Sequence, residues 1–330
     1  MEKDVNYFTY RPYLKLGRAF NFIIGGRGVG KTFNGIYESI MIDKVKYIYM
    51  RRTQDEVDLI GTNGDNVELS PFAKVNARTN NPRYQKPPYN LIPTHLHMER
   101  VNKNIWGLYN DFKPEVPTHV GMVLGLSTVA KLRGFDADEY EILQYDEFIP
   151  EKHVKKLGKG DAEGEAFLNA YETINRDREF EGRKPLICFI STNANDIGHP
   201  LLSILGLIPI LERMQRKHIH FVDLPVRNAT LTLYEDVDFK EKKKRTALYQ
   251  LTKGTKFYDM ALNNEFSYND FSQIKSMNLK EFIPVCSIPK VTIYKHKSLD
   301  IYYASPHNIK CETYTESEQD IARFNLEHGR

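Results

Sequence analysis

The chain has 330 residues, 41% of them hydrophobic and 27% charged, and this composition is typical of a globular protein with room for two domains. Its formal net charge of +3 excludes a surface that is basic throughout, so any contact with DNA must come from local clusters of Lys and Arg. No apolar run reaches the ~20 residues of a membrane span, and the polar amino terminus predicts no signal peptide. Three scattered cysteines favour reduced thiols and no metal site: Cys188, Cys286 and Cys311. We therefore expect a cytoplasmic protein that does not contact a membrane.

Aromatic side chains dominate the segment before the first predicted strand. Residues 7–13 contain Tyr7, Phe8, Tyr10 and Tyr13. Two interpretations remain open at this point. The segment either stacks on the adenine ring of a nucleotide or anchors the amino terminus against the first helix.

A glycine-rich turn follows, between an apolar strand predicted at residues 20–24 and a helix predicted at residues 33–42. It matches the P-loop pattern G-x-x-x-x-G-K-[ST], in which main-chain N–H groups and the start of the helix surround phosphate oxygens. We expect Lys31 to reach the β- and γ-phosphates of ATP and Thr32 to bind Mg²⁺. The predicted nucleotide-binding residues are Gly25, Gly26, Arg27, Gly28, Val29, Gly30, Lys31 and Thr32.

Residues 46–52 alternate apolar and polar side chains and end in Arg51 and Arg52, which predicts a second strand that ends on the nucleotide side of the sheet. Residues 53–117 are rich in Asn, Pro and Gly and predict no continuous helix. We expect an insertion of short strands and loops there, with a hairpin within residues 94–109.

Two acidic residues end a later strand. Residues 141–145 are mostly apolar, with Gln144 as an interruption, and Asp146 and Glu147 follow directly. In a Walker-B element the first acid holds Mg²⁺ and the second activates the attacking water, so we assign these roles to Asp146 and Glu147. The alternative is a solvated acidic turn after an ordinary strand.

A helix predicted at residues 164–178 leads to an apolar strand at residues 185–190, which runs into a polar turn. In that turn Asn193 is placed to hydrogen-bond the γ-phosphate or the attacking water. An ordinary Ser/Asn turn is the alternative.

The remaining pattern predicts the domain organisation. The chain divides into an ATPase domain at 1–205, a linker or lid at 206–254 and a carboxyl-terminal domain at 255–330 with short strands. Within the linker, residues 238–251 predict one helix with a basic first half. Such a helix is either solvated surface or a contact for DNA or RNA.

Four motifs occur in one order along the chain: residues 25–32, 127–134, 145–148 and 190–195. This ordered set resembles the large-terminase DNA-packaging ATPases, and more closely the packaging ATPases of phi-29-type tailed phages. In those proteins paired arginines like Arg51 and Arg52 also close the second strand. The resemblance covers roughly residues 5–270.

The resemblance implies an α/β fold of the additional-strand (ASCE) P-loop class, with a central, mostly parallel sheet flanked by helices. It implies a smaller α+β carboxyl-terminal domain like a reduced RNase-H fold. It also implies an ATPase that uses ATP and Mg²⁺ and forms a ring of identical subunits, a pentamer by analogy. Such a ring moves double-stranded DNA through a portal into a procapsid in the infected host cell, and a structural RNA is a further candidate partner.

In that family, arginines of the neighbouring subunit complete each active site. Arg176 best matches the arginine-finger position, Arg178 is the alternative, and Arg133 matches a second basic residue that acts across the interface. A fixed guanidinium stabilises the charge that develops on the γ-phosphate. The alternative for Arg176 is a purely structural role, in which its side chain caps carbonyl groups at a helix end.

Two other functions remain to be distinguished from a packaging ATPase. A complete terminase would also cut DNA, which needs about three clustered carboxylates for two metal ions. The acidic residues after position 255 show no such spacing, so we expect no nuclease activity: Asp259, Glu265, Asp270, Glu281 and Asp300. The other alternative is a nucleotide-binding assembly factor that does not hydrolyse ATP.

Overall fold

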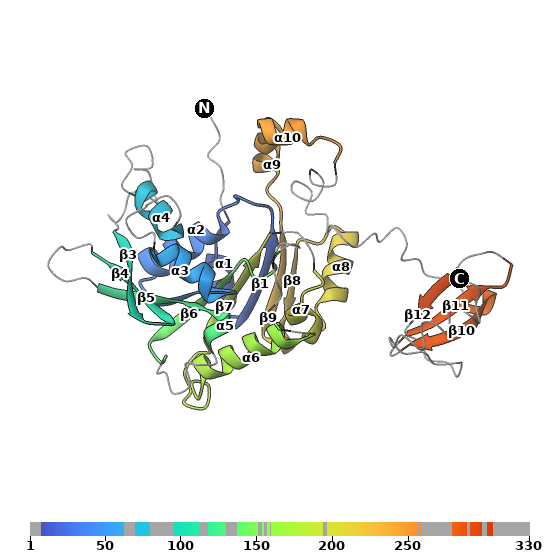
Figure 1. Ribbon diagram of the computed structural model, residues 1–330, viewed down its shortest axis with the longest axis horizontal. Helices are drawn as coiled ribbons and strands as arrows, with labels where there is room; N and C mark the ends of the chain where they lie inside the picture. Colours follow the sequence, from blue (N-terminus) through green and yellow to red (C-terminus); the bar gives the residue numbers. More distant parts are fainter. Residues whose placement is uncertain are drawn as a thin grey trace. The chain divides into compact units, whose positions relative to one another are not determined.

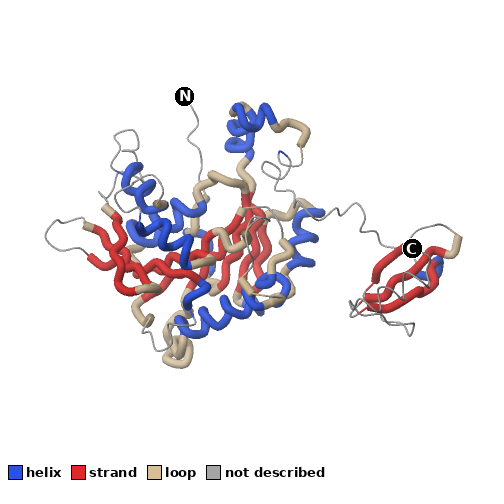
Figure 2. Tube along the Cα trace, viewed as in Figure 1, coloured by secondary structure: helices blue, strands red, loops and turns tan. Residues whose placement is uncertain are grey.

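The computed structural model describes residues 8–62, 70–79, 95–111, 118–129, 137–150, 154, 157–158, 160–193, 197–255, 258, 279–288, 291–298 and 302–305. The chain forms two compact units, residues 1–268 and 269–330. The described part of the first unit is built on a nine-stranded sheet in the order β3-β4-β5-β2-β6-β7-β1-β9-β8 (Figure 1). Helices cover both sides of this sheet (Figure 2).

The strands of this sheet are β1 (Phe20–Gly25), β2 (Lys46–Arg51), β3 (Leu96–Asn102), β4 (Ile105–Asn110), β5 (Thr118–Gly125), β6 (Tyr140–Asp146), β7 (Ile187–Thr192), β8 (Phe221–Leu224) and β9 (Ala229–Tyr234). The helices are α1 (Arg11–Leu16), α2 (Lys31–Ile36), η1 (Tyr37–Ile42), α3 (Gln54–Thr62), α4 (Pro71–Thr79), α5 (Leu126–Val129), α6 (Ala162–Asn175), α7 (Pro200–Ile204), α8 (Ile208–Arg216), η3 (Pro225–Arg227), α9 (Val237–Lys244) and α10 (Ala247–Leu251). The π-helical turn η1 continues α2 directly.

Strand β7 lies between β1 and β6, and all three are parallel. The carboxyl ends of β1, β6 and β7 therefore meet at one edge of the sheet, where a doubly wound fold binds its ligands. This order confirms the predicted α/β fold with an additional strand beside the P-loop strand. The predicted hairpin within residues 94–109 is present as the antiparallel pair β3 and β4.

The sheet extends further along the chain than the predicted ATPase domain. Strand β9 pairs in parallel with β1, and β8 pairs with β9, so residues 206–254 contribute to the sheet instead of forming a separate linker. The reason is that residues 229–233 are buried against β1 and complete its second side. The first compact unit extends to residue 268, and the second begins at residue 269, whereas the carboxyl-terminal domain was predicted to begin at residue 255.

Two predictions of local structure were wrong. Residues 53–117 contain the helices α3 and α4, because the buried Val57, Phe72 and Val75 attach them to the core in spite of the surrounding Asn and Gly residues. The basic segment 238–251 is two short helices and not one, since Thr246 between them has an extended backbone.

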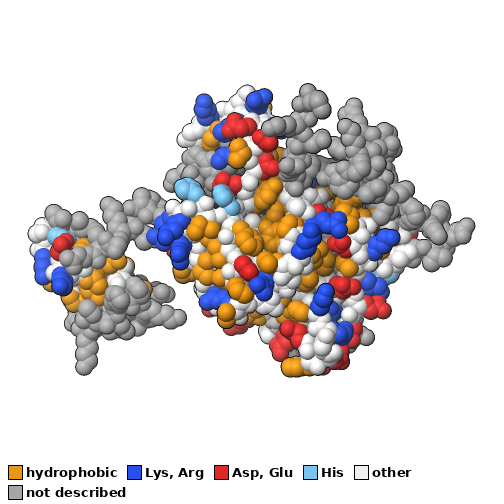
Figure 3. Space-filling model, turned by 180° about the vertical axis from the view of Figure 1, so that it is seen from behind, with side chains coloured by type: hydrophobic (Ala, Val, Ile, Leu, Met, Phe, Trp, Pro, Cys, Tyr) orange, Lys and Arg blue, Asp and Glu red, His pale blue; other side chains and the backbone are white. Residues whose placement is uncertain are grey.

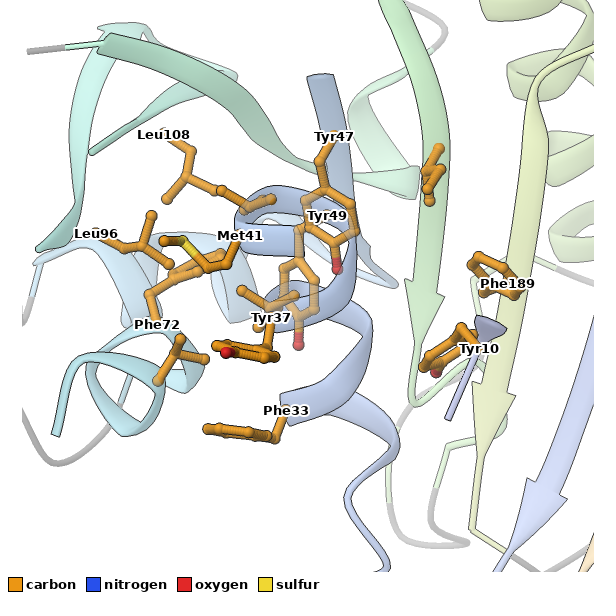
Figure 4. Close-up of a cluster of buried hydrophobic side chains, with 14 of the residues drawn as sticks. Tyr10, Phe33, Tyr37, Met41, Tyr47, Tyr49, Phe72, Leu96, Leu108 and Phe189 are labelled. Carbon is orange, nitrogen blue, oxygen red and sulfur yellow. The ribbon is translucent and has the colours of Figure 1, made fainter. Parts of the chain in front are cut away.

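Aromatic side chains fill much of the core between the sheet and α2, η1 and α4 (Figure 4). Tyr49 of β2 packs edge-on against Phe72 of α4, with ring centroids 5.5 Å apart. In the same core cluster, the Tyr10 ring lies 4.2 Å from that of Phe189 in β7, and Phe8 is 2% exposed. Of the two interpretations of residues 7–13, the described part of the segment fits the anchor, because these rings are buried in the protein interior.

The helix α2 approaches β6 very closely. A Cβ atom on Gly35 would lie only 2.0 Å from Oε1 of Gln144, so a larger residue at this position would force the Gln144 side chain to move. Gln144 is fully buried and accepts a hydrogen bond from the hydroxyl of Tyr47. The polar interruption in the predicted Walker-B strand is therefore a buried packing contact that holds α2, and with it the P-loop, on the sheet.

The described part of the second unit is a three-stranded antiparallel sheet of β10 (Phe282–Ile288), β11 (Val291–His296) and β12 (Tyr302–Ser305), preceded by the turn η5 (Leu279–Glu281). These are short strands, as predicted for residues 255–330, whereas the likeness to an RNase-H fold stays a prediction. Of the five acidic residues considered for a nuclease, the structure describes Glu281.

On the face of the first unit shown in Figure 3, acidic and basic side chains are interspersed, and neither kind forms a large patch. This distribution agrees with the small net charge. Among the described helices, none is long and apolar enough to span a membrane. Cys188 and Cys286 are both buried.

Candidate functional site

The amine of Lys31 lies at the base of the P-loop. Lys31 is 6% exposed, and its Nζ donates hydrogen bonds to the carbonyl oxygens of Gly25 at 2.9 Å and Gly26 at 3.0 Å. Gly30 precedes it with φ of 94°, a left-handed conformation that favours glycine and allows the loop to turn into α2. Burial lowers the pKa of Lys31, while the carboxylates of Glu147 and Asp146 oppose this shift. The loop thus holds one cation beside two acidic side chains.

The first of these acids is fixed by several partners. Thr32 Oγ1 donates to Asp146 Oδ2 at 2.6 Å, and Ser191 Oγ donates to Asp146 Oδ1 at 2.6 Å. The hydroxyl of Tyr49 donates to Oδ2 at 3.0 Å, and Nη1 of Arg51 lies 4.0 Å from the same oxygen. A threonine hydroxyl next to a buried carboxylate is an oxygen donor set that suits Mg²⁺. These two residues fit the magnesium ion that the P-loop pattern implies.

The second acid has an unusual backbone and a single dominant partner. Glu147 has φ of 55°, and Asn193 Nδ2 lies 2.9 Å from each of its carboxylate oxygens. Burial, followed by the charge of Asp146, raises the pKa of Glu147, although Lys31, Arg51 and Arg27 counteract it. A carboxylate with a raised pKa is a better proton acceptor than an ordinary one.

A cavity of about 270 Å³ opens over these groups. Its lining comes from the P-loop with the start of α2, from α4, and from the ends of β6 and β7: Gly28, Gly30, Lys31, Thr32, Phe33, Pro71, Lys74, Glu147 and Asn193. Sequence reasoning predicted the P-loop, Glu147 and Asn193 for this site but missed α4. No motif marks Lys74, because its place at the cavity depends on a helix that the sequence did not predict.

Two of the residues around Asp146 also escaped prediction as site residues. Tyr49 and Ser191 reach it from β2 and β7, and their position at strand carboxyl ends is the signal that identifies them.

The paired arginines of β2 separate in the structure. Arg51 points toward Asp146, whereas Arg52 is 1% exposed and forms a buried ion pair with Glu163, at 2.6 Å from Nε to Oε1.

The predicted arginine fingers lie at the opposite edge of the sheet from the P-loop. Arg176 follows the last residue of α6, and Asn175 before it accepts a hydrogen bond at 2.8 Å from the N–H of Leu186, just before β7 begins. The Arg176 side chain is exposed. Within one subunit it therefore does not reach Lys31, and a role at the phosphates requires a second subunit.

The alternative arginine finger, Arg178, is buried and cannot reach a neighbouring subunit as the exposed Arg176 can. Arg178 is 3% exposed, and its Nη2 donates to the main-chain oxygen of Ala137 before β6. Burial and the charge of Arg183 lower the pKa of Arg178. This geometry favours Arg176 over Arg178. Arg133 lies outside the described residues.

Another group of metal-ligand side chains lies away from this cavity. His95 Nδ1 and His97 Nδ1 are 3.4 and 3.1 Å from Oδ2 of Asp111. His97 lies in β3, His95 and Asp111 flank the edge hairpin β3–β4, and none of the three lines the cavity at Lys31. They are therefore not part of the candidate nucleotide site.

Comparisons with known proteins give one family. The family model of the podovirus DNA encapsidation protein (Gp16) matches residues 118–308. The DNA packaging protein of Bacillus phage B103 is 25% identical over 289 residues, which cover 81% of this chain and 71% of that protein. The DNA packaging protein of Bacillus phage phi29 is 24% identical over 269 residues, which cover 81% and 67%.

Solved structures share the fold. The bacteriophage Phi-29 viral genome packaging motor assembly matches with a TM-score of 0.60 and 20% identity, over 98% of this chain and 90% of that chain. The Phi-28 gp11 DNA packaging motor matches with a TM-score of 0.53 and 15% identity, over 98% and 91%.

Proposed function

Because the chain belongs to the podovirus DNA encapsidation protein (Gp16) family, we propose that it is the ATPase of a motor that moves double-stranded viral DNA into a preformed procapsid. The observation that carries this proposal is that Lys31, Thr32, Glu147 and Asn193 line one cavity and that Asp146 is hydrogen-bonded to Thr32. These residues come from three strand ends that are far apart in the sequence. Their chemistry is that of nucleotide hydrolysis.

Nucleotide binding uses the groups of the P-loop. The amine of Lys31 exchanges its contacts with the carbonyls of Gly25 and Gly26 for oxygens of the β- and γ-phosphates. Thr32 and Asp146 hold Mg²⁺, which neutralises charge on the phosphates when it is bound. Tyr49 and Ser191 keep Asp146 in place through hydrogen bonds to its carboxylate.

Hydrolysis uses Glu147 as general base. Its carboxylate accepts a proton from the water that attacks the γ-phosphate, and its raised pKa makes that transfer more favourable. Asn193 orients Glu147 and lies 3.5 Å from the Lys31 amine, so it links the base to the phosphate-binding cation. It is a positioning residue with access to the γ-phosphate.

A neighbouring subunit completes the site in this proposal. Arg176 is exposed and lies at the opposite edge of the sheet from its own P-loop, so a ring in which that edge faces the next P-loop brings a guanidinium to the γ-phosphate. Arg133 is the second basic residue proposed to act across the interface. The proposed partners are other copies in a ring, with five as the expected number, the portal of the procapsid, double-stranded DNA and a structural RNA.

The test is ATP hydrolysis by the purified chain with and without double-stranded DNA. We expect DNA to stimulate turnover, and Glu147→Gln to reduce turnover by about 100-fold or more while ATP still binds. Glu141→Gln, at an exposed position of β6, the strand that precedes Glu147, is the matched control and leaves turnover unchanged. Hydrolysis by Glu147→Gln at the wild-type rate would contradict the assignment.

The same preparation distinguishes the alternatives. Plasmid incubated with the protein and Mn²⁺ should stay intact, and cleavage that depends on acids after residue 255 would favour a complete terminase. A protein that binds ATP but hydrolyses none, even with DNA and at concentrations that form rings, would favour an assembly factor.

A further inference from the structure

The helix α9 begins next to the P-loop. Strand β9 pairs in parallel with β1, and in this register Tyr234 lies opposite Gly25, the first P-loop residue. Two residues later Asp236 starts α9, and its Oδ1 accepts a hydrogen bond at 2.7 Å from the N–H of Phe239. Sheet register and cap together place the first turn of this helix beyond the carboxyl end of β9, next to the strand β1 that leads into the P-loop (Figure 1).

A side chain of α9 touches the loop itself. A Cβ atom on Gly28 would lie 3.2 Å from Cζ of Phe239, and Gly28 has φ of 81° and lines the cavity. The half-buried Phe239 ring also packs against the hydrophobic core. The P-loop and α9 are therefore in direct van der Waals contact through Phe239.

One turn further along α9, Lys243 lies on the same side of the helix as Phe239. Its Nζ is 5.1 Å from the centroid of the Phe239 ring and 5.3 Å from that of Tyr249 in α10. Within the described residues, no carboxylate forms an ion pair with it. Burial, and then the positive charges of Lys31 and Arg27, lower the pKa of Lys243 to about 8. A partly buried cation near two others is a place where an anion binds favourably.

The side from which α9 approaches indicates which phosphates are concerned. Asp146 ends β6 and Glu147 follows it; β6 lies on one side of β1, and the γ-phosphate must lie near these acids for hydrolysis. Strand β9 and α9 lie on the other side of β1. A nucleotide with its γ-phosphate near the two acids would have the α- and β-phosphates, which ATP and ADP share, closer to this side.

We propose that Lys243 is a further phosphate-binding residue of this site, which contacts the α- and β-phosphates of the bound nucleotide from α9. The proposal deepens the proposed ATPase function and depends on it. It makes α9, which carries Lys243, part of the nucleotide site. Phe239 and Tyr249 support the lysine stem in this position.

The experiment is calorimetric titration of the full chain with ADP and with ATP at pH 7. We expect Lys243→Met to weaken binding of both nucleotides to the same extent, by about tenfold. Methionine keeps the apolar stem, so the fold is retained. Lys243→Arg keeps the charge and most of the affinity. The matched control is Lys242→Met, which removes the same charge from the neighbouring, exposed position.

Two results would overturn the proposal. One is equal affinities in Lys243→Met and Lys242→Met, and the other is a loss for ATP without a loss for ADP. A wild-type chain that binds neither nucleotide would instead overturn the proposed function, so the two failures are distinguishable.

Discussion

The amide nitrogen of Asn193 lies 2.9 Å from both carboxylate oxygens of Glu147, and this pair joins the ends of the neighbouring strands β7 and β6. Glu147 has φ of 55°, a conformation that is strained in residues with a side chain. Strain of this kind persists where the surrounding contacts determine the geometry, which is common at functional sites. Asn193 is therefore expected to position the base as well as to fill the cavity wall.

Replacing Asn193 with Ala should lower kcat for ATP about 10- to 100-fold and leave KM nearly unchanged, because Glu147 loses its orienting donor while the P-loop stays intact. Steady-state kinetics at saturating Mg²⁺ measures both constants. Asn169→Ala, at an exposed position of α6, serves as the control. An unchanged kcat would show that Asn193 does not orient the base.

Arg176 and Glu147 should complement each other between subunits. We expect Arg176→Ala and Glu147→Gln to be inactive alone, because each removes one part of every shared site. An equal mixture should recover roughly a quarter of wild-type turnover if sites act independently, since that fraction pairs an intact base with an intact neighbouring arginine. No recovery in rings that contain both variants would argue against a shared site.

Arg178 is expected to behave differently from Arg176. Because it is buried and bonded to the Ala137 carbonyl, Arg178→Ala should destabilise the fold by about 1–3 kcal/mol. Arg176→Ala should change the free energy of unfolding by less than about 0.5 kcal/mol, because the side chain is exposed. Urea unfolding of both variants measures the difference. Equal destabilisation would contradict the structural distinction between the two arginines.

The contact between Gly35 and Gln144 gives a prediction about stability. Gly35→Ala should lower the free energy of unfolding by about 1–3 kcal/mol, because its Cβ meets the buried Gln144 side chain. The double variant Gly35→Ala/Gln144→Ala should lose less free energy of unfolding than the two single variants lose together. The shorter side chain at position 144 leaves room for the Cβ at position 35. Strict additivity in urea unfolding would show that the two residues do not contact each other.

The lowered pKa of Lys243 gives a pH dependence. Phosphate stabilises the charged amine, so nucleotide binding should raise that pKa from about 8 and take up a proton. The contribution of Lys243 to affinity is then full below pH ~8 and decreases as the pH rises above it. The charged and titratable groups around it are Lys31 and Arg27 of the P-loop, Tyr249 of α10, and Glu241, Lys242 and Lys244 of its own helix.

Comparison with Lys243→Met isolates this effect from other titrations. The ratio of wild-type to Lys243→Met affinity for ADP should be smaller at pH 9 than at pH 7. A ratio that does not change, or one that grows, would contradict the assignment of the proton to Lys243.

Helices α3 and α4 show one limit of pattern reasoning. Each is nine residues long and lies among Asn, Gly and Pro residues, so its periodicity is too short to stand out. Val57, Phe72 and Val75 make these segments helical through burial against the sheet, which is a tertiary effect. Lys74 could not be predicted at the cavity for the same reason.

The sequence by itself determined the strand-loop-helix unit at Gly25–Thr32 and the acids after β6, because these features depend on neighbours in the chain. The tertiary structure alone decided that Tyr49 and Ser191 hold Asp146, that Arg178 is buried while Arg176 is exposed, and that α9 lies on the P-loop. These contacts join residues that are tens to hundreds of positions apart. The order of strands in the sheet brings them together, and that order results from the burial of both faces of every central strand, which no local pattern encodes.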